Sequence, residues 1–309
     1  MNQVAPLKLD CPKPALRIGI GIATAGRANI LSETLRIIAK QTELPDKVVL
    51  CPRTPSDIEP DVLTSLPYEV ALVTSNPGLP AQRNAILSRA DDLDIIIFFD
   101  DDFFPEPNYV LNAKALLHDN QSIVLATGLL IEDGIHGPGL DPVTARDRLS
   151  SFPPQAYERD REDPRYGVYG CNMVVRLRPV RKNNLRFDEA LPLYAWQEDI
   201  DFSRQMAPHG RIVISPALVG IHLGAKQGRT SGVRFGYSQI ANPIYLMRKG
   251  TMSMSFGLRT MMRNVAANVV KSAKPEPHVD RLGRLKGNLL AILDSLRGNL
   301  HPRRILDIN

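Results

Sequence analysis

The feature that most constrains this chain is a run of five apolar residues followed at once by three aspartates. Residues 95–99 are all β-branched or aromatic, and Asp100, Asp101 and Asp102 come next. Such a run predicts a strand buried on both faces of a parallel sheet. Adjacent carboxylates repel one another unless a cation offsets their charge, and open α/β sheets bind ligands beyond the carboxyl ends of their strands. The pattern favours a hard divalent cation with a phosphate beyond it; a solvated acidic turn is the alternative.

Strands and helices are expected to alternate through the first half of the chain. Apolar runs predict strands at residues 17–22, 47–50, 70–73, 95–99 and 122–126, and helical spacing predicts helices at residues 30–41, 81–89 and 108–117. This order is typical of an α/β protein with a mostly parallel sheet flanked by helices. Further along, we expect a strand at 170–175, a helix at 198–207, and a strand pair at 211–215 and 217–221.

Length and composition are those of an ordinary globular protein. The 309 residues are 43% apolar and 23% charged. No signal peptide and no apolar stretch of about 18 residues is evident in the sequence. The three cysteines are widely spaced, which indicates a reducing compartment. We therefore expect a cytoplasmic protein.

Positive charge is concentrated at the end of the sequence. Residues 248–309 hold twelve Lys and Arg against four Asp and Glu, although the whole chain carries only +5. A basic tail on a slightly acidic body favours an anionic membrane surface as partner and argues against nucleic acid. The tail also contains a leucine-rich stripe at helical spacing, made of Leu282, Leu285, Leu289, Ile292 and Leu296. This stripe would lie on a membrane, pack against the rest of the chain, or form a dimer contact.

A second polar cluster lies at the start of the helix expected at residues 198–207. Glu198, Asp199 and Asp201 follow Trp196 closely. Acids at a helix start are common because they complement the helix dipole and cap its amides. A tryptophan beside two carboxylates is also a frequent sugar-stacking arrangement, although Trp196 is equally compatible with the core. His222 follows the last expected strand, as a structural residue or as a ligand for Mn²⁺ or Mg²⁺.

Six short sequence motifs occur in an order and spacing that together are more specific than any one of them. They are the loop at residues 23–27, Ala81-Gln82-Arg83-Asn84, Phe99-Asp100-Asp101-Asp102 with Pro105, Gly170-x-Asn172, Glu198-Asp199, and the strand-final His222. Over roughly residues 17–224, the chain resembles the family 2 inverting glycosyltransferases of the GT-A fold, in particular those of bacterial polysaccharide biosynthesis.

The resemblance implies a role for each matching residue. Asp102, the last acid of the D-x-D motif, and His222 would hold Mn²⁺ or Mg²⁺ at the donor diphosphate. Asp199 would be the general base, and Glu198 would orient hydroxyl groups. The donor nucleotide would be bound by Thr24, Gly26, Arg27, Arg83, Asp100 and Asp101, and the acceptor by Trp196 and Asn172.

The sequence departs from the family pattern in two places. The second expected strand ends Leu50-Cys51-Pro52-Arg53, where the family usually has Asp-Asp-Gly-Ser, and this leaves the nucleobase open. The Gln-x-x-Arg-Trp element of processive synthases is absent from the sequence. One sugar transferred per encounter is therefore the better expectation.

The resemblance thus implies an inverting, non-processive glycosyltransferase. It would move a sugar from a nucleotide-diphosphate sugar to a saccharide or a lipid-linked saccharide, in surface or exopolysaccharide biosynthesis. Residues 1–16 would be an arm, residues 17–230 the catalytic domain, and residues 231–309 a basic helical extension at the inner face of a membrane. A nucleotidyltransferase and a non-catalytic sugar-nucleotide-binding protein are the alternatives. Donor sugar, linkage and oligomeric state remain open.

Overall fold

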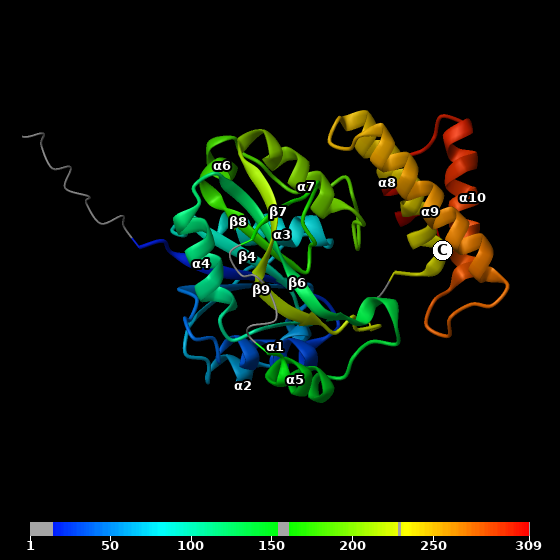
Figure 1. The fold of residues 1–309 in the computed structure, drawn as a ribbon. Helices are drawn as coiled ribbons and strands as arrows, with labels where there is room; N and C mark the ends of the chain where they lie inside the picture. Colours follow the sequence, from blue (N-terminus) through cyan, green and yellow to red (C-terminus); the bar gives the residue numbers. More distant parts are fainter. Residues whose placement is uncertain (1–14, 154–160, 228–229, 309) are drawn as a thin grey trace, which may run out of the picture.

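The structure, a computed structural model, describes residues 15–153, 161–227 and 230–308. Figure 1 shows a sheet flanked by helices and, beside it, a group of C-terminal helices. The strands are β1 (Ile18–Thr24), β2 (Lys47–Pro52), β3 (Glu69–Leu72), β4 (Ile95–Asp100), β5 (Phe103–Pro105), β6 (Ile123–Asp133), β7 (Asp163–Pro164), β8 (Asn172–Arg176) and β9 (Arg211–His222). The α-helices are α1 (Ala28–Ile38), α2 (Pro60–Leu63), α3 (Leu79–Ser88), α4 (Tyr109–Asp119), α5 (Pro142–Ser151), α6 (Leu177–Lys182), α7 (Glu198–Met206), α8 (Gly232–Lys249), α9 (Met254–Ser272) and α10 (Arg281–Leu296). The arm predicted at residues 1–16 lies almost wholly outside the described residues.

One mixed sheet runs through the α/β part of the chain. Its strand order is β3-β2-β1-β4-β8-β6-β9-β5, and β7 pairs with β9. The segment β3-β2-β1-β4 is parallel, as predicted, because helical crossovers connect its strands. β8 then enters between β4 and β6, antiparallel to both. The α/β prediction is confirmed, but the sheet is less parallel than expected.

The strand pair predicted at 211–215 and 217–221 is wrong, because β9 is a single strand. Its ladder with β6 pairs Ser215 with Gly128 and resumes with Val219 opposite Leu129, so residues 216–218 form a bulge. Pro216 lies in this bulge, where its missing amide hydrogen costs no ladder bond. The proline interrupts the alternation pattern without ending the strand.

β4 is the central strand that carries the acidic turn. Ile95, Ile97 and Phe99 pack on one face of the sheet with residues of α1, and Ile96 and Phe98 pack on the other with residues of α3. All five are at most 1% exposed, which confirms a strand buried on both faces. The three aspartates therefore leave the sheet at its carboxyl edge, beside the end of β1.

The helices α8, α9 and α10 pack mainly on one another (Figure 1). α8 and α10 approach through glycines, since a Cβ at Gly236 would lie 2.0 Å from the carbonyl oxygen of Arg284. The leucine-rich stripe does not face this contact: Leu282, Leu289 and Leu296 are 64%, 54% and 81% exposed. The alternative that the stripe packs against the rest of the chain is thus wrong for these three leucines. Within the described segments, no helix is both long and apolar enough to cross a bilayer.

Gly287→Val is expected to destabilise this helical group. A Cβ at Gly287 would lie 2.0 Å from the carbonyl oxygen of Val233 and 2.6 Å from the amide nitrogen of Tyr237, so α10 must move away from α8. Overpacking of this kind typically costs about 1–3 kcal/mol. Thermal unfolding followed by circular dichroism measures the effect. Gly137→Val is the matched control, since nothing lies within 4 Å of a Cβ there; equal melting points for both variants would contradict the close helix approach.

Candidate active site

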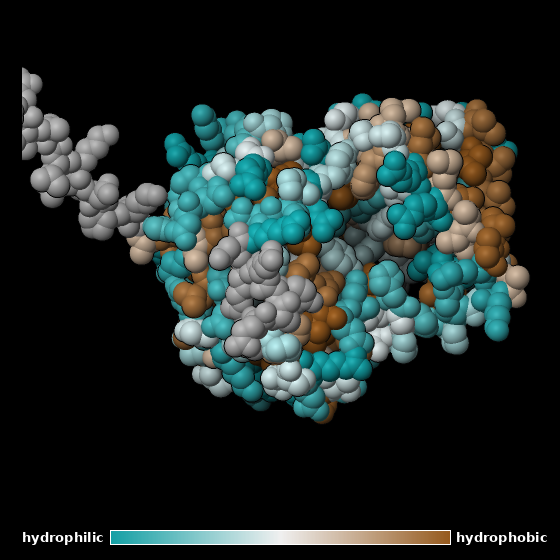
Figure 2. All heavy atoms as spheres, viewed as in Figure 1, coloured by the Kyte–Doolittle hydropathy of each residue, from teal (hydrophilic) through white to brown (hydrophobic). Residues whose placement is uncertain are grey.

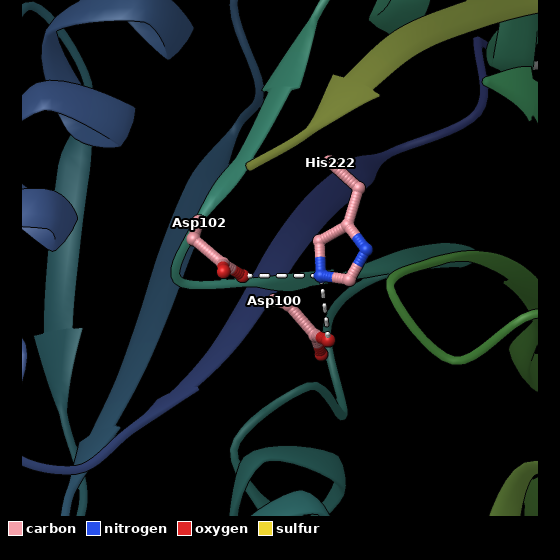
Figure 3. Close-up of side chains that lie close together, drawn as sticks. All are labelled: Asp100, Asp102 and His222. Carbon is pink, nitrogen blue, oxygen red and sulfur yellow. Dashed lines mark ion pairs between the residues drawn. The ribbon is translucent and has the colours of Figure 1, made fainter. Parts of the chain in front are cut away.

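Two strand ends bring together the residues of the predicted metal site. Asp100 ends β4 and Asp102 precedes β5, while His222 ends β9, opposite Phe103 in the β5–β9 ladder. Nε2 of His222 lies 3.4 Å from Oδ1 of Asp102 and 3.9 Å from Oδ2 of Asp100. Figure 3 shows the imidazole directed at both carboxylates. One ligand atom from each of the three residues lies within 4.8 Å of the others.

Asp133 completes this group, and the sequence reasoning missed it. The β6–β9 ladder places Asp133 opposite His222, and its Oδ1 lies 2.8 Å from Nδ1 of the imidazole. The hydroxyl of Tyr169 donates to its other oxygen at 3.2 Å. The Asp133 contact fixes the ring so that Nε2 faces Asp100 and Asp102. The run Leu129-Leu130-Ile131 before Glu132-Asp133 was an available signal, because it repeats the pattern of an apolar strand ending in acids.

Arg27 places a guanidinium group on the same acidic turn. It contacts Oδ1 of Asp101 at 3.0 Å and Oδ2 of Asp102 at 3.2 Å. Asp101 is fully buried, and its second oxygen accepts a hydrogen bond from the hydroxyl of Thr24 at 2.7 Å. The first loop is held in turn by Asp57, which accepts from the amide of Gly26 at 2.6 Å. Of the residues predicted at the donor nucleotide, Thr24 and Arg27 therefore contact the acidic turn, and Gly26 contacts Asp57.

The charges inside this cluster largely compensate one another. Burial alone would raise the pKa of Asp102, but His222 and Arg27 hold it at about 2. Burial alone would lower the pKa of His222, but Asp102 and Asp133 raise it to about 10. Burial raises the pKa of Asp101 to about 7 in spite of Arg27. The mutual repulsion of the three aspartates is thus partly offset within the chain, because Arg27 and His222 supply positive charge.

Arg83 joins the acidic turn to the second acidic cluster. It is 2% exposed, and its guanidinium contacts Oε1 of Glu198 at 2.5 Å and Oδ1 of Asp100 at 3.3 Å. It also donates to the carbonyl oxygen of Gly170 at 2.7 Å. The structure therefore commits Arg83 to internal partners, where it positions two carboxylates. Burial raises the pKa of Glu198 to about 8, although Arg83 opposes this shift.

Asp199 stands in the first turn of α7, next to this bridge. Its two carboxylate oxygens accept hydrogen bonds from the amides of Ile200, at 2.8 Å, and Gly170, at 3.1 Å. Burial raises the pKa of this carboxyl above its ordinary value. The preceding loop is strained: Leu193, Ala195 and Gln197 have φ values of 58°, 51° and 72°, which non-glycine residues rarely adopt. Such strain clusters at functional sites.

The two residues predicted at the acceptor differ in accessibility. Trp196 is half-buried and packs edge-on against Phe235, with ring centroids 5.9 Å apart. Asn172 is fully buried, and its side-chain oxygen accepts from the hydroxyl of Thr127 at 2.5 Å. Contact between Asn172 and an acceptor would require the site to rearrange.

The residues present fit a divalent cation. Carboxylate oxygens and an imidazole nitrogen are ligands that Mn²⁺ accepts. Oδ1 of Asp102 is buried, and no hydrogen bond to it is found within the described residues. It faces Nε2 of His222, so both atoms are directed at one point. Asp102 and His222, with Asp100 beside them, are the residues that could hold such an ion.

Comparison with known sequences identifies a family. The sequence model described as "Glycosyl transferase family 2" matches residues 20–182, just over half of the chain. The match spans the first loop, the acidic turn and β8. No match was found among curated proteins.

Comparison with solved structures confirms the GT-A fold. S. aureus TarS 1-349 in complex with UDP-GlcNAc is 15% identical with a TM-score of 0.57, over 94% of this chain and 83% of that one. The mannosyltransferase PcManGT from Pyrobaculum calidifontis, in complex with GDP-Man and Mn²⁺, is 16% identical with a TM-score of 0.54, over 94% and 85%. A longer TarS chain is 17% identical with a TM-score of 0.50, and the match covers 75% of this chain but only 40% of that one.

Proposed function

The chain belongs to glycosyl transferase family 2, and on this premise we propose that it is an inverting, non-processive glycosyltransferase. One observation supports this most: the guanidinium of Arg83 contacts both Asp100 of the D-x-D turn and Glu198 of the Glu-Asp pair. The residues proposed for the donor diphosphate and those proposed for deprotonating an acceptor thus lie around the buried guanidinium of Arg83. We take residues 17–230 as the catalytic domain and residues 231–309 as its helical extension.

Asp102 and His222 are proposed to hold Mn²⁺ or Mg²⁺, with Asp133 orienting the imidazole. Mn²⁺ is present in the PcManGT structure, whose fold this chain shares. When bound, such an ion acts as a Lewis acid that stabilises the charge of a departing nucleoside diphosphate. Arg27, already 3.2 Å from Asp102, is placed to contact the diphosphate as well. Thr24, the last residue of β1, and Gly26, in the loop after it, are proposed to meet the nucleotide.

Asp199 is proposed to remove the proton from the attacking hydroxyl. Its raised pKa suits a base, because a carboxylate with a higher pKa accepts a proton more readily. The two backbone amides fix its orientation. Attack on one face of the sugar, with departure from the other, inverts the anomeric centre, as in inverting glycosidases. Glu198 is proposed to orient hydroxyl groups, since Arg83 holds it beside Asp199.

The acceptor is proposed to be a saccharide or a lipid-linked saccharide of surface-polysaccharide assembly. Trp196, half-buried beside the Glu-Asp pair, offers a ring on which a sugar could stack. The basic extension is proposed to meet an anionic membrane surface, where a lipid-linked acceptor would be found. This would place a cytoplasmic enzyme on the inner face of the membrane.

A panel of UDP- and GDP-sugars tests the proposal. Each donor is incubated with Mn²⁺ and the protein, and the released product is identified. Slow donor hydrolysis that releases a nucleoside diphosphate is expected for at least one donor. Release of pyrophosphate when the protein is given a nucleoside triphosphate and a sugar 1-phosphate in place of the donor would indicate a nucleotidyltransferase instead. Donor binding without turnover in the presence of candidate acceptors would indicate a binding protein. The anomeric configuration of the product, read by proton NMR, tests inversion.

Asp133→Asn is expected to weaken Mn²⁺ binding by about 10–100-fold, the usual effect of removing a carboxylate that orients a metal-ligating histidine. The variant keeps the shape of the side chain but removes the charge next to Nδ1 of His222. Titration of free Mn²⁺ by electron paramagnetic resonance measures the affinity without turnover. Glu132→Gln is the control, because Glu132 is next to Asp133 in the chain but pairs with Arg148. Equal affinity in Asp133→Asn and wild type would leave Asp133 with a purely structural role.

A further inference from the structure

The outer surface of α9 and α10 exposes an unusual amount of apolar side chain. On α10, five large residues are 40–81% exposed, namely Leu282, Leu289, Ile292, Leu293 and Leu296. On α9, five more are 45–73% exposed, namely Met254, Leu258, Met262, Val269 and Val270. Figure 2 shows apolar surface along the edge of the helical group that is turned away from the sheet domain. We call these ten residues the outer face.

The outer face is exposed because the opposite side of α10 makes the packing contacts. Gly287, Asn288 and Ala291 are the buried residues of α10. Asn288 donates to the carbonyl oxygen of Gly236 at 2.7 Å, and its own side-chain oxygen accepts from Asn268 of α9 at 2.8 Å. These contacts fix the rotation of α10 about its axis. The outer-face leucines therefore cannot turn inward without breaking buried hydrogen bonds. An exposed apolar patch of this kind marks an interaction surface.

Positive charge accompanies the outer face along both helices. Lys286 and Arg297 stand one helical turn after Leu282 and Leu293, so they lie on the same side of α10. On α9, Arg259 and Arg263 directly follow two outer-face residues and are exposed. Among the described residues, no carboxylate lies within 4.0 Å of either arginine, and α9 itself contains no acid. The surface therefore combines apolar side chains with positively charged ones.

We propose that the outer face docks on an anionic lipid bilayer, with α9 and α10 lying in the plane of the interface. Apolar side chains that enter the acyl boundary, with cations at the level of the headgroups, are the chemistry of an interfacial helix. A second copy of the chain fits less well, since the same surface on both partners would bring like charges together. Docking through the outer face rests on the membrane partner proposed above, whereas the chemistry proposed for Asp199 and Asp102 is independent of it.

Co-sedimentation of the full chain with vesicles tests the outer face. Wild type is expected to bind vesicles containing phosphatidylglycerol much more strongly than pure phosphatidylcholine vesicles. The triple variant Leu282→Glu, Leu289→Glu, Leu296→Glu is expected to lose about tenfold or more in vesicle affinity. Its matched control is Leu72→Glu, Leu111→Glu, Val143→Glu, three exposed apolar residues of the sheet domain, which is expected to bind like wild type. Equal binding by wild type and the outer-face variant would overturn the proposal.

A second pair of variants tests the charge. Arg259→Gln, Arg263→Gln is expected to weaken binding to anionic vesicles, and Lys40→Gln, Lys182→Gln is the control with the same loss of charge. Added salt should weaken wild-type binding, because surface attraction is screened over about 8–10 Å at physiological ionic strength. Wild type that ignores anionic vesicles at low salt refutes the proposal. Light scattering that finds a dimer, dissociated by the outer-face variant, assigns the surface to a second copy instead. Donor hydrolysis measured on the same samples separates failure of docking from failure of the proposed function.

Discussion

Asp199→Asn is expected to lower kcat by about 10²–10⁴-fold, the usual contribution of a positioned general base. The amide keeps the shape of the carboxylate and can still accept a hydrogen bond from the backbone amide of Ile200 or Gly170. It cannot take up a proton from the acceptor hydroxyl at neutral pH. Donor affinity should change little, because the acidic turn and its partners remain intact. Steady-state turnover, with donor binding measured in parallel by calorimetry, tests both statements.

Asp201→Asn is the informative comparison, since Asp201 stands in the same helical turn but serves the structure. Its carboxylate accepts from the hydroxyl of Thr251 at 2.5 Å and from the ammonium of Lys249 at 2.8 Å. We expect this variant to lower the melting point more than it lowers kcat. If Asp199→Asn instead turns over at the wild-type rate, Asp199 only caps α7 and Glu198 becomes the candidate base.

The pH dependence of kcat also tests whether Asp199 is the general base. Burial raises the pKa of Asp199 above its ordinary value of 3.8, and only the ionised carboxylate acts as a base. The rate should therefore fall on the acid side through a midpoint above 3.8, and it should be restored as the pH rises. A profile that reports this pKa in wild type and is lost in the residual activity of Asp199→Asn would support the role. An acid limb that persists unchanged in the variant would assign the titration to another group.

Local sequence patterns located most of the strands and helices near the site. The run at residues 95–99 became β4, and the helix expected at 30–41 became α1 at Ala28–Ile38. These elements were predictable because apolar periodicity is set by which faces they bury. The D-x-D turn, the Glu-Asp pair and His222 stood out because each follows an expected strand or begins an expected helix. Their roles came from the resemblance to family 2 glycosyltransferases.

Long-range pairing decided what the sequence could not show. β6 was expected to end at residue 126, but its ladder with β9 carries it to Asp133, which brings that carboxylate to His222. The rotation of α10 was equally hidden. Helical spacing marks its leucines as one face, but the tight contact between Gly236 and Arg284 decides that the opposite face packs. Likewise, nothing near Arg83 in the sequence indicates that Asp100 and Glu198 meet at its guanidinium.

Asp102→Asn is expected to abolish measurable Mn²⁺ binding at concentrations that saturate wild type, and donor turnover with it. A carboxylate is the charged, hard ligand that a divalent cation requires, and an amide oxygen is a much weaker substitute. The loss should exceed that of Asp101→Asn, because Thr24 and Arg27 already occupy the oxygens of Asp101. Electron paramagnetic resonance of free Mn²⁺ distinguishes the two variants.

The same substitution should also affect stability, with a sign fixed by the pKa of Asp102. That pKa is lowered from 3.8 to about 2, so the ionised carboxylate stabilises the fold above the ordinary pKa, and this contribution is lost as the pH falls through 2. At neutral pH, Asp102→Asn leaves Arg27 and His222 with one counter-charge fewer and should lower the melting point. Mn²⁺ should raise the melting point of wild type and leave that of the variant unchanged. A variant that is stabilised by Mn²⁺ as strongly as wild type would show that the ion binds elsewhere, and that Asp102 serves only to balance the charge of Arg27 and His222.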